Sequence, residues 1–417
     1  MKYKIADPAL AHQGKLKIAL AEKHMPVLAR IAQDFAKRRP LNNITIAACL
    51  HVTTETAVLM KTLAAGGANV ALCGSNPLST QNNIAAALAE SGIHVFAWRG
   101  VSTEKYYWCL GKVLDCKPNL TIDDGADLIS FIHKKRRGLL KTVFAGQEET
   151  TTGVMRLRTM AKEGKLKYPV VAINDTPTKR MFDNYYGTGQ SAVDGLLRAT
   201  NILLAGKIVV VAGYGYCGSG IAKAAKGLGA RVMVTEVNPL FALKATMDGF
   251  EVMPMKKAAQ RGEVFLTTTG NKDVITKEHF RIMRDGSILG NSGHFNVEIG
   301  VQDLERLAVT KKTVRENLAE YTLKNNKKLY LIGEGRLMNL AAAEGHPSAV
   351  MDMSFANQAL TAEWLVENHR TLKRHVYEVP QSIDARVATM KLASMGIKID
   401  VLTTAQENYL SGWHKGT

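Results

Sequence analysis

The chain of 417 residues lacks the features of disulfide-rich, zinc-cluster and membrane-spanning proteins. Its five cysteines, Cys49, Cys73, Cys109, Cys116 and Cys217, are odd in number and have no Cys-x-x-Cys spacing, which excludes a disulfide framework and a cysteine zinc site. No apolar run reaches the roughly 18 residues of a transmembrane helix. No apolar segment follows the charged N-terminus, so no secretory signal is expected. These absences predict a cytoplasmic protein with no membrane partner.

Acidic residues are scarce relative to basic ones, and the net charge is +17. Such an excess is typical of nucleic-acid binding when it is clustered and accompanied by a recognition motif. Here the basic residues are scattered, with short clusters only at Lys134–Arg137 and Lys311-Lys312, and no such motif is present. We therefore expect a solvated basic surface that tolerates anionic ligands, and no nucleic-acid partner.

A glycine-rich turn lies in the middle of the chain. The apolar run Lys207–Ala212 predicts a strand, and it ends at Gly213, Gly215 and Gly218, which have the spacing Gly-x-Gly-x-x-Gly. The first glycine permits a tight turn, the second lets a pyrophosphate approach the backbone, and the third lets helix and strand pack closely. The turn predicts a dinucleotide site.

The following segments complete a βαβ unit. Cys217–Leu228 predicts a helix, whose N-terminal N–H groups and dipole favour phosphate. Arg231–Thr235 predicts a second strand, which delivers Glu236. A carboxylate at this place accepts hydrogen bonds from the adenosine ribose, which favours NAD over NADP. The alternative interpretation is an ordinary βαβ unit with three turn glycines.

The rest of the chain also alternates between helical and strand-like segments, as in doubly wound α/β folds. Residues 15–38 predict one helical segment and Thr54–Ala65 another. Junctions are expected near residues 184–190 and near Gly345, after which Ser348–Asn368 predicts a helix. The length suffices for two or three domains. The fold class is α/β, with two doubly wound parallel-sheet domains and a small C-terminal segment.

Three polar clusters in the first half allow two interpretations each. The carboxylates of Asp123–Asp127 indicate either a cation site or a solvated acidic turn. The run Glu148–Gly153 indicates either a site for phosphate or ribose, or a helix start capped by Thr150. Lys179 and Asp183, four residues apart, form either a surface ion pair or a lysine tuned for proton transfer.

Two loop histidines, His294 and His346, follow predicted strand and domain ends. A loop histidine is usually structural, but two near a dinucleotide turn also suit proton transfer. Read together, the segments resemble the S-adenosylhomocysteine hydrolase (adenosylhomocysteinase) family, in its shorter archaeal and bacterial form. The matching strings span the chain in order: Cys49–Thr53, Glu55–Ala57, Ser79–Gln81, Asp123–Gly125, Glu148–Gly153, Asn174-Asp175, Lys179, Phe182–Asn184, Val211–Gly218, Thr267–Gly270, Gly293–Phe295, Asn339-Leu340 and Gly345–Ser348.

The resemblance implies the reversible cleavage of a nucleoside thioether, S-adenosylhomocysteine, to adenosine and homocysteine. Tightly bound NAD oxidises the 3′-hydroxyl, the resulting ketone acidifies the C4′ hydrogen, homocysteine is eliminated, water adds, and the hydride returns. Lys179 would handle the 3′-hydroxyl proton, with Asp183 placing it and Glu149 holding the ribose hydroxyls. Asp124 and His51 would transfer protons at C4′ and C5′.

The remaining expected contacts also follow from the resemblance. His294 would bind the 3′-oxygen, and Thr53, Glu55 and His346 would line the base pocket. No metal is expected. The expected NAD contacts are Thr150, Thr151, Thr152, Asn184, Gly213, Tyr214, Gly215, Tyr216, Cys217, Gly218, Glu236, Asn271, Ser292, Gly293, His294 and Asn339.

The family pattern implies a substrate-binding domain over residues 1–186, completed by 347–390, and a Rossmann NAD-binding domain over 187–346. Residues 391–417 would form a C-terminal oligomerisation tail, with a homotetramer as the expected assembly. Glu344 stands where many members carry methionine near the base, so S-inosylhomocysteine remains an alternative substrate. A net NAD-dependent dehydrogenase would explain the glycine turn and a histidine, but not Lys179 with its carboxylates.

Overall fold

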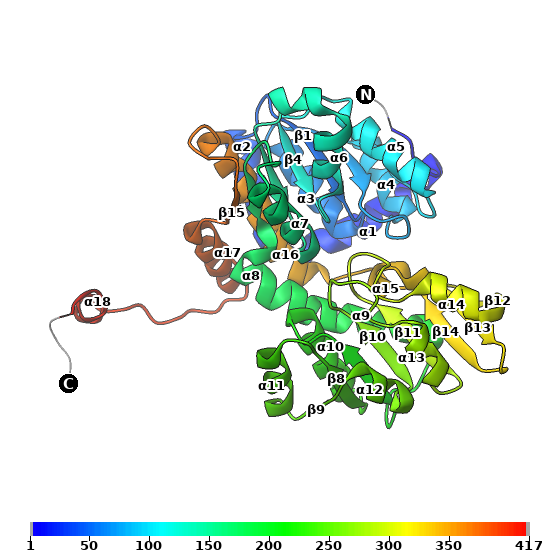
Figure 1. Ribbon diagram of the computed structural model, residues 1–417. Coiled ribbons are helices and arrows are strands. Elements are labelled where there is room, and N and C mark those ends of the chain that lie inside the picture. Colours follow the sequence, from blue (N-terminus) through cyan, green and yellow to red (C-terminus); the bar gives the residue numbers. More distant parts are fainter. Residues whose placement is uncertain (1–2, 414–417) are drawn as a thin grey trace.

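The computed structural model describes residues 3–413, which form two α/β units, each built around one sheet (Figure 1). The first sheet has the order β15-β6-β5-β4-β1-β2-β3, and all its pairs are parallel. Its strands are β1 (Thr45–Leu50), β2 (Asn69–Gly74), β3 (His94–Phe96), β4 (Leu120–Asp123), β5 (Ala145–Glu148), β6 (Val170–Ala172) and β15 (Val376–Glu378).

Both faces of the first sheet are covered, as the near-continuous apolar strands require. Along β1, Ile46, Ala48 and Leu50 face one core, and Ala47 and Cys49 face the other. The first core is closed by α1 (Ala11–Lys23), α2 (Pro26–Arg38), α3 (Thr54–Ala65), α4 (Asn82–Glu90) and α16 (Ser348–Asn368); the second by α5 (Thr103–Leu114), α6 (Asp127–Lys135) and α7 (Thr151–Lys162).

The sequence prediction was right for the helices Thr54–Ala65 and Ser348–Asn368 and wrong for residues 15–38. That segment forms two helices, α1 and α2, because Pro26 occupies the first turn of α2, where its missing N–H is not needed, and cannot continue α1. Short 3₁₀ turns add η1 (Pro8–Leu10), η2 (Arg137–Lys141) and η3 (Ile173–Asp175).

The C-terminal part of the chain returns to the first unit. Strand β15 pairs with β6, and α16 and α17 (Gln381–Ser394) pack beside α2. On α16 the buried carboxylate of Asp352 accepts the backbone N–H groups of Val27 (3.2 Å) and Leu28 (2.8 Å) at the start of α2. It also pairs with Lys391 of α17 at 2.8 Å. One side chain thus joins three helices.

We predict that Asp352→Ala lowers the free energy of unfolding by about 3 kcal/mol. The substitution leaves two buried N–H groups and the Lys391 ammonium without their acceptor. Thermal unfolding followed by circular dichroism measures this. The control Asp34→Ala removes an exposed i,i+4 ion pair to Arg38 and should change the melting temperature little. Equal melting temperatures for the two variants would refute the prediction.

The second sheet has the order β12-β13-β14-β11-β10-β7-β8-β9. From β9 to β14 its pairs are parallel and follow the Rossmann order, whereas β13 runs antiparallel to both β12 and β14. The antiparallel edge was not predicted. The strands are β7 (Ile208–Ala212), β8 (Arg231–Thr235), β9 (Glu251–Val252), β10 (Val264–Thr267), β11 (Ser287–Asn291), β12 (Ala308–Arg315), β13 (Leu318–Leu323) and β14 (Lys328–Ile332).

Helices cover both faces of this sheet as well. One core is closed by α9 (Thr188–Thr200), α10 (Tyr216–Gly227), α11 (Pro239–Met247) and α15 (Met338–Ala341), and the other by α12 (Met255–Arg261), α13 (Lys277–Ile282) and α14 (Val301–Leu307). The 3₁₀ turn η5 (Gly333–Gly335) precedes α15. The α/β class with two parallel-dominated sheets is therefore confirmed. The predicted strand Arg231–Thr235 is exact, and the helix predicted at Cys217 starts one residue earlier.

Beyond α17 the chain leaves both units and reaches α18 (Thr404–Ser411) (Figure 1). Residues 393–413 are exposed and include Ile399, Val401 and Leu410. Of the predicted tail 391–417, residues 414–417 lie outside the described residues. Among the helices within residues 3–413, none has both the length and the apolar character for crossing a bilayer.

Candidate active site

One cavity lies where the carboxyl ends of the two sheets meet. In each sheet the chain order reverses at the centre, between β1 and β4 and between β7 and β10, and ligands of open α/β sheets bind at such points. The cavity has about 850 Å³ of empty space including its mouth. Its polar lining comes from both units: His51, Thr53, Glu55, Thr56, Asp124, Glu149, Thr150, Thr151, Lys179, Asp183, Asn184, Thr188, Cys217, Ser292, His294, Asn339 and His346.

The glycine turn after β7 has the geometry of a phosphate loop. Gly213 has a φ of 96°, in the left-handed region. A Cβ on Gly218 would lie 1.9 Å from the carbonyl oxygen of Gly213, whereas a Cβ on Gly215 would meet nothing within 4 Å. Since α10 begins at Tyr216, its free N–H groups face the open side of Gly215. The turn therefore leaves room for a pyrophosphate.

Several predicted cofactor residues line the cavity, and two of them have buried polar atoms without a hydrogen-bond partner among the described residues. Thr150, Thr151, Asn184, Cys217, Ser292, His294 and Asn339 line it. Among the described residues, no hydrogen bond reaches the buried Ser292 Oγ or Asn339 Oδ1. Buried polar atoms are normally paired, so these two fit a polar ligand such as the nicotinamide half of NAD.

The other predicted cofactor residues lie outside the cavity lining. Glu236 directly follows β8 and accepts the N–H of Tyr214 at 2.7 Å. The side chain of Tyr214 is buried and its hydroxyl donates to Asp248 at 2.7 Å, so this side chain is not available to a ligand at the turn. Tyr216 and Asn271 are exposed. The other predicted cofactor residues that do not line the cavity are Thr152, Gly213, Gly215, Gly218 and Gly293.

Lys179 lies in the cavity, buried among acceptors. Its Nζ is 2.7 Å from Asn184 Oδ1, 3.4 Å from Asp183 Oδ1 and 3.6 Å from Glu149 Oε1. The interpretation of Lys179 and Asp183 as a surface pair is therefore wrong.

The helix around Lys179 explains its partners. Lys179 ends α8 (Pro177–Lys179), and η4 (Arg180–Gly187), which follows, is a π-helix. The wider π turn, with its i→i+5 period, brings residue i+5 onto the side of residue i. Both Asp183 and Asn184 therefore face Lys179, whereas an α-helix would turn Asn184 away.

Two further residues complete this group. His346 Nδ1 lies 3.0 Å from Asp183 Oδ1, so the expected base-pocket histidine is tied to the Lys179 group. The hydroxyl of Ser354 on α16 donates to Asp183 at 2.9 Å. Glu149 accepts the Nε2 of Gln358, also on α16.

Charges in the group balance each other. Burial opposes the charge of Lys179, but Asp183 and Glu149 outweigh it and raise its pKa. Burial likewise opposes the charge of Asp183, but Lys179 and His346 outweigh it and lower its pKa. Burial raises the pKa of Glu149 to about 8, against the attraction of Lys179. At neutral pH the group therefore holds an ammonium, a carboxylate and a carboxylic acid, because one buried cation balances one buried anion.

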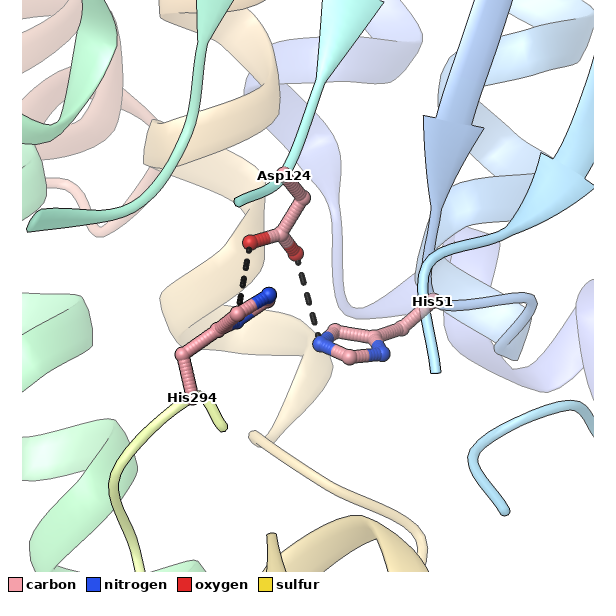
Figure 2. Close-up of side chains that lie close together, drawn as sticks. All are labelled: His51, Asp124 and His294. Carbon is pink, nitrogen blue, oxygen red and sulfur yellow. Dashed lines mark ion pairs between the residues drawn. The ribbon is translucent and has the colours of Figure 1, made fainter. Parts of the chain in front are cut away.

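A second group faces the same cavity. Figure 2 shows Asp124 between two imidazoles, with Oδ2 3.4 Å from His51 Nε2 and Oδ1 3.6 Å from His294 Nδ1. His51 Nδ1 also lies 2.7 Å from Ser79 Oγ. Burial lowers the pKa of His51 to about 4, against the pull of Asp124, so the imidazole is neutral at pH 7. A neutral imidazole beside a carboxylate can exchange a proton with a ligand.

Thr53 and Glu55 form the end of the cavity near α3. Thr53 is the N-cap of α3 and accepts the N–H of Thr56 at 3.5 Å. Glu55 Oε1 accepts the hydroxyls of Thr54 (2.8 Å) and Ser348 (2.6 Å). This carboxylate therefore joins α3 to α16 at the edge of the cavity.

Sequence reasoning missed the function of Glu148. This fully buried residue was predicted only as part of a helix start or phosphate site. Its Oε1 accepts the N–H groups of Gly125 (2.8 Å) and Thr150 (3.0 Å), and its Oε2 accepts that of Ala126 (2.9 Å). Gly153 leaves it room, since a Cβ there would lie 2.1 Å from Oε1. The carboxylate fixes the loops of Asp124 and Glu149, and the predicted Thr150 side-chain cap is absent.

Two family models and several relatives match the chain. The model "S-adenosyl-L-homocysteine hydrolase" matches residues 2–147, and "S-adenosyl-L-homocysteine hydrolase, NAD binding domain" matches residues 184–345. "Adenosylhomocysteinase" of Aquifex aeolicus is 57% identical, with 100% of both chains covered. The same coverage holds for "S-inosyl-L-homocysteine hydrolase" of Methanocaldococcus jannaschii at 57% identity and "Adenosylhomocysteinase" of Sulfurisphaera tokodaii at 56%.

A Rossmann sheet with an open glycine turn, beside two buried groups of titratable side chains, defines an enzyme that uses NAD. The two family-model matches and the sequence identity to full-length relatives show which family this is: the chain belongs to the S-adenosyl-L-homocysteine hydrolase family. NAD is its cofactor.

The open side of Gly215 gives a direct test of the cofactor site. We predict that Gly215→Ala keeps the fold, because the new methyl meets no protein atom, but weakens NAD binding at least tenfold because it fills the pyrophosphate space. Titration of the NAD-free protein, with its melting temperature recorded, measures both. Gly227→Ala, on α10 and also without a neighbour within 4 Å, is the control. Undiminished NAD affinity in Gly215→Ala would contradict the assignment.

Proposed function

We propose that this enzyme catalyses the reversible hydrolysis of S-adenosyl-L-homocysteine to adenosine and L-homocysteine. The observation that carries the proposal is the pairing of two proton-exchanging groups in one cavity: Lys179, Asp183 and Glu149 on one side, and His51, Asp124 and His294 on the other. A simple hydride transfer needs one such group. Removing a thioether at C5′ and adding water needs a second.

Bound NAD would supply a reversible hydride exchange at the sugar. Thr150, Thr151, Asn184, Ser292 and Asn339 would hold its nicotinamide half, and the glycine turn and Glu236 its adenosine half. The residues of the chain position the nucleoside and move its protons.

The Lys179 group would exchange the proton of the 3′-hydroxyl. The Lys179 ammonium would donate to the 3′-oxygen, with Asp183 fixing it. Glu149 Oε1, which has no hydrogen-bond partner among the described residues, would accept from a ribose hydroxyl. Its pKa of about 8 lies near neutral pH, so the carboxyl is mostly protonated there, and its deprotonated fraction would accept a proton and later release it.

Asp124 and His51 would act at C4′ and C5′. Asp124 would take the C4′ proton, and the neutral His51 would serve the leaving thiol and then the attacking water. His294 reaches Asp124 from the second sheet and would hydrogen-bond the 3′-oxygen. Closure of the two units around the ligand would exclude bulk water during this step.

A second substrate, S-inosyl-L-homocysteine, is supported by the M. jannaschii relative, whose identity equals that of the A. aeolicus protein. The Glu55 carboxylate near Thr53 can accept from the amino group of adenine or from the N1–H of hypoxanthine. Incubation with homocysteine and either adenosine or inosine, followed by thiol loss, distinguishes the two. Loss with neither nucleoside would refute both proposals.

A net dehydrogenase is the third candidate. Such an enzyme consumes added NAD in proportion to product, whereas the proposed hydrolase regenerates its NAD in every turnover. Turnover with NAD no higher than the enzyme concentration therefore supports hydrolysis. Stoichiometric formation of free NADH would overturn it.

We also propose residues 1–186 with 347–390 as the substrate-binding domain, and 187–346 as the NAD-binding domain. The family-model ranges and the packing of α16 and β15 on the first unit support this. The exposed apolar side chains of residues 393–413 support the tail as an oligomerisation segment in a homotetramer. Sedimentation of the full chain and of a chain ending at Ser394 tests this. The five free thiols support a cytoplasmic location.

A further inference from the structure

The imidazole of His294 has little room to move in the cavity. It reaches Asp124 across the two units, with Nδ1 3.6 Å from Oδ1 (Figure 2). Its Nε2 lies close against Gly125, where a Cβ would be only 2.3 Å away. Gly125 also has a φ of 108°, which favours glycine at this position. A shift of His294 by about 1 Å would therefore either lose Asp124 or press the ring against Gly125, and shifts of that size are costly at reacting groups.

His294 stands on a tight turn after β11, and the side chain of Asn291 fills the inside of that turn. Asn291 is the last residue of β11 and is fully buried. Its Oδ1 accepts the N–H of Gly293 at 2.8 Å and the hydroxyl of Thr267 at 2.9 Å. Its Nδ2 donates to the carbonyl oxygens of Gly293 and Phe295, both at 3.0 Å. One amide thus holds the backbone on both sides of His294.

The same amide reaches the segment that carries Asn339. Nδ2 of Asn291 also lies 2.9 Å from the carbonyl oxygen of Gly335 in η5. The backbones of Asn291 and Leu337 form a parallel β-bridge just beyond it. This segment leads into α15, whose Asn339 lines the cavity. Asn291 therefore joins the turn of His294 to the segment of a predicted cofactor residue.

The outer side of the turn is closed by the buried carboxyl group of Glu298. A Cβ on Gly293 would lie 1.7 Å from Glu298 Oε1 and 3.1 Å from Asn291 Oδ1. Glu298 itself accepts the N–H groups of Thr269 and Gly270, both at 2.8 Å. Because Gly293 is enclosed between the amide and the carboxyl group, the turn keeps its shape while both are in place.

We propose that Asn291 is a positioning residue of the proposed hydrolysis, which acts by setting the place of the His294 imidazole. An amide is required there, because its oxygen faces two donors and its NH₂ group faces three carbonyl oxygens. A carboxylate would face the three carbonyl oxygens with no hydrogen to donate, and an apolar side chain would leave buried groups unpaired. The effect on turnover rests on the proposed function of His294, whereas the effect on the position of His294 rests on the geometry alone.

The first test combines Asn291→Ser with His294→Ala in the NAD-loaded enzyme and follows thiol release. Asn291→Ser should lower kcat on the order of 10²-fold, and by no more than His294→Ala does. The double variant should be no slower than His294→Ala alone, because both substitutions act through the same imidazole. The control Ser287→Ala removes a 2.8 Å hydrogen bond to the carbonyl oxygen of Arg284 at the other end of β11 and should leave kcat unchanged.

The second test is independent of turnover. A crystal structure of the NAD-loaded Asn291→Ser enzyme should show the His294 imidazole moved away from Asp124 by about 1 Å or more, and that of Ser287→Ala should not. Thr267→Val removes one donor to Asn291 Oδ1 and should give a smaller change of the same kind in both tests. It takes the place of Asn291→Ser if that variant does not fold.

Two outcomes would overturn the proposal: an undisplaced His294 in the variants, or losses of kcat that multiply when the substitutions are combined. Failure of the proposed function looks different. In that case His294 would still be displaced in the crystal structure, but the unchanged enzyme would show no thioether turnover.

Discussion

Lys179→Met is expected to lower kcat on the order of 10³-fold while leaving the fold intact. Methionine matches the length of the lysine stem but carries no charge and no proton. Asp183 keeps two partners in the variant, His346 at 3.0 Å and Ser354 at 2.9 Å, so its carboxylate is not left unpaired. The loss should therefore fall on proton exchange at the 3′-oxygen and not on folding.

Two measurements separate these effects for Lys179→Met. Thiol release gives kcat, and the absorbance of reduced nicotinamide after mixing with adenosine reports the sugar oxidation alone. Both should fall. Lys223→Met, an exposed lysine on α10, is the matched control. A Lys179→Met enzyme that keeps more than a tenth of the activity would remove Lys179 from the proposed chemistry.

The features that could be predicted from the sequence are mostly those whose residues lie close together along the chain. The glycine turn was found because strand, turn and helix are contiguous, so that Gly213, Gly215 and Gly218 encode one phosphate loop. Lys179 and Asp183 were recognised as a pair because they lie four residues apart. Their burial could not be read from that spacing.

The parts that escaped prediction depend on distant segments or on backbone geometry. Ser354 and Gln358 reach Asp183 and Glu149 from α16, more than 170 positions along the chain. The π-helix that adds Asn184 to the Lys179 group has no signal in residue type. Strands β12, β13 and β14 follow one another without helices and pair antiparallel, whereas alternation of strands with helices predicts parallel pairing only.

Glu148 is one of the residues whose function could not be predicted from the sequence, and Glu148→Gln tests it. We expect kcat to fall on the order of 10²-fold, which is the effect of about 1 Å of misplacement at a reacting group. Burial raises the pKa of Glu148 well above its usual range. Its two carboxyl oxygens accept three N–H groups, whereas a carboxamide presents an NH₂ group on one side. Turning its oxygen toward Gly125 and Thr150 keeps two hydrogen bonds and sets the NH₂ against the N–H of Ala126. The disturbance should therefore fall on the loop of Asp124.

Because the disturbance is confined to the loop of Asp124, Glu148→Gln should affect one step of the reaction and not the other, which a general loss of stability would not do. In Glu148→Gln, reduction of bound NAD by adenosine should persist, because Thr150 and the Lys179 group keep their contacts, whereas thiol release should fall and its pH profile should shift. Lys179→Met should lose both. Glu163→Gln, an exposed carboxylate after α7, should behave as the unchanged enzyme. If Glu148→Gln lost NAD reduction and thiol release in parallel, Glu148 would support the whole site and not Asp124 in particular.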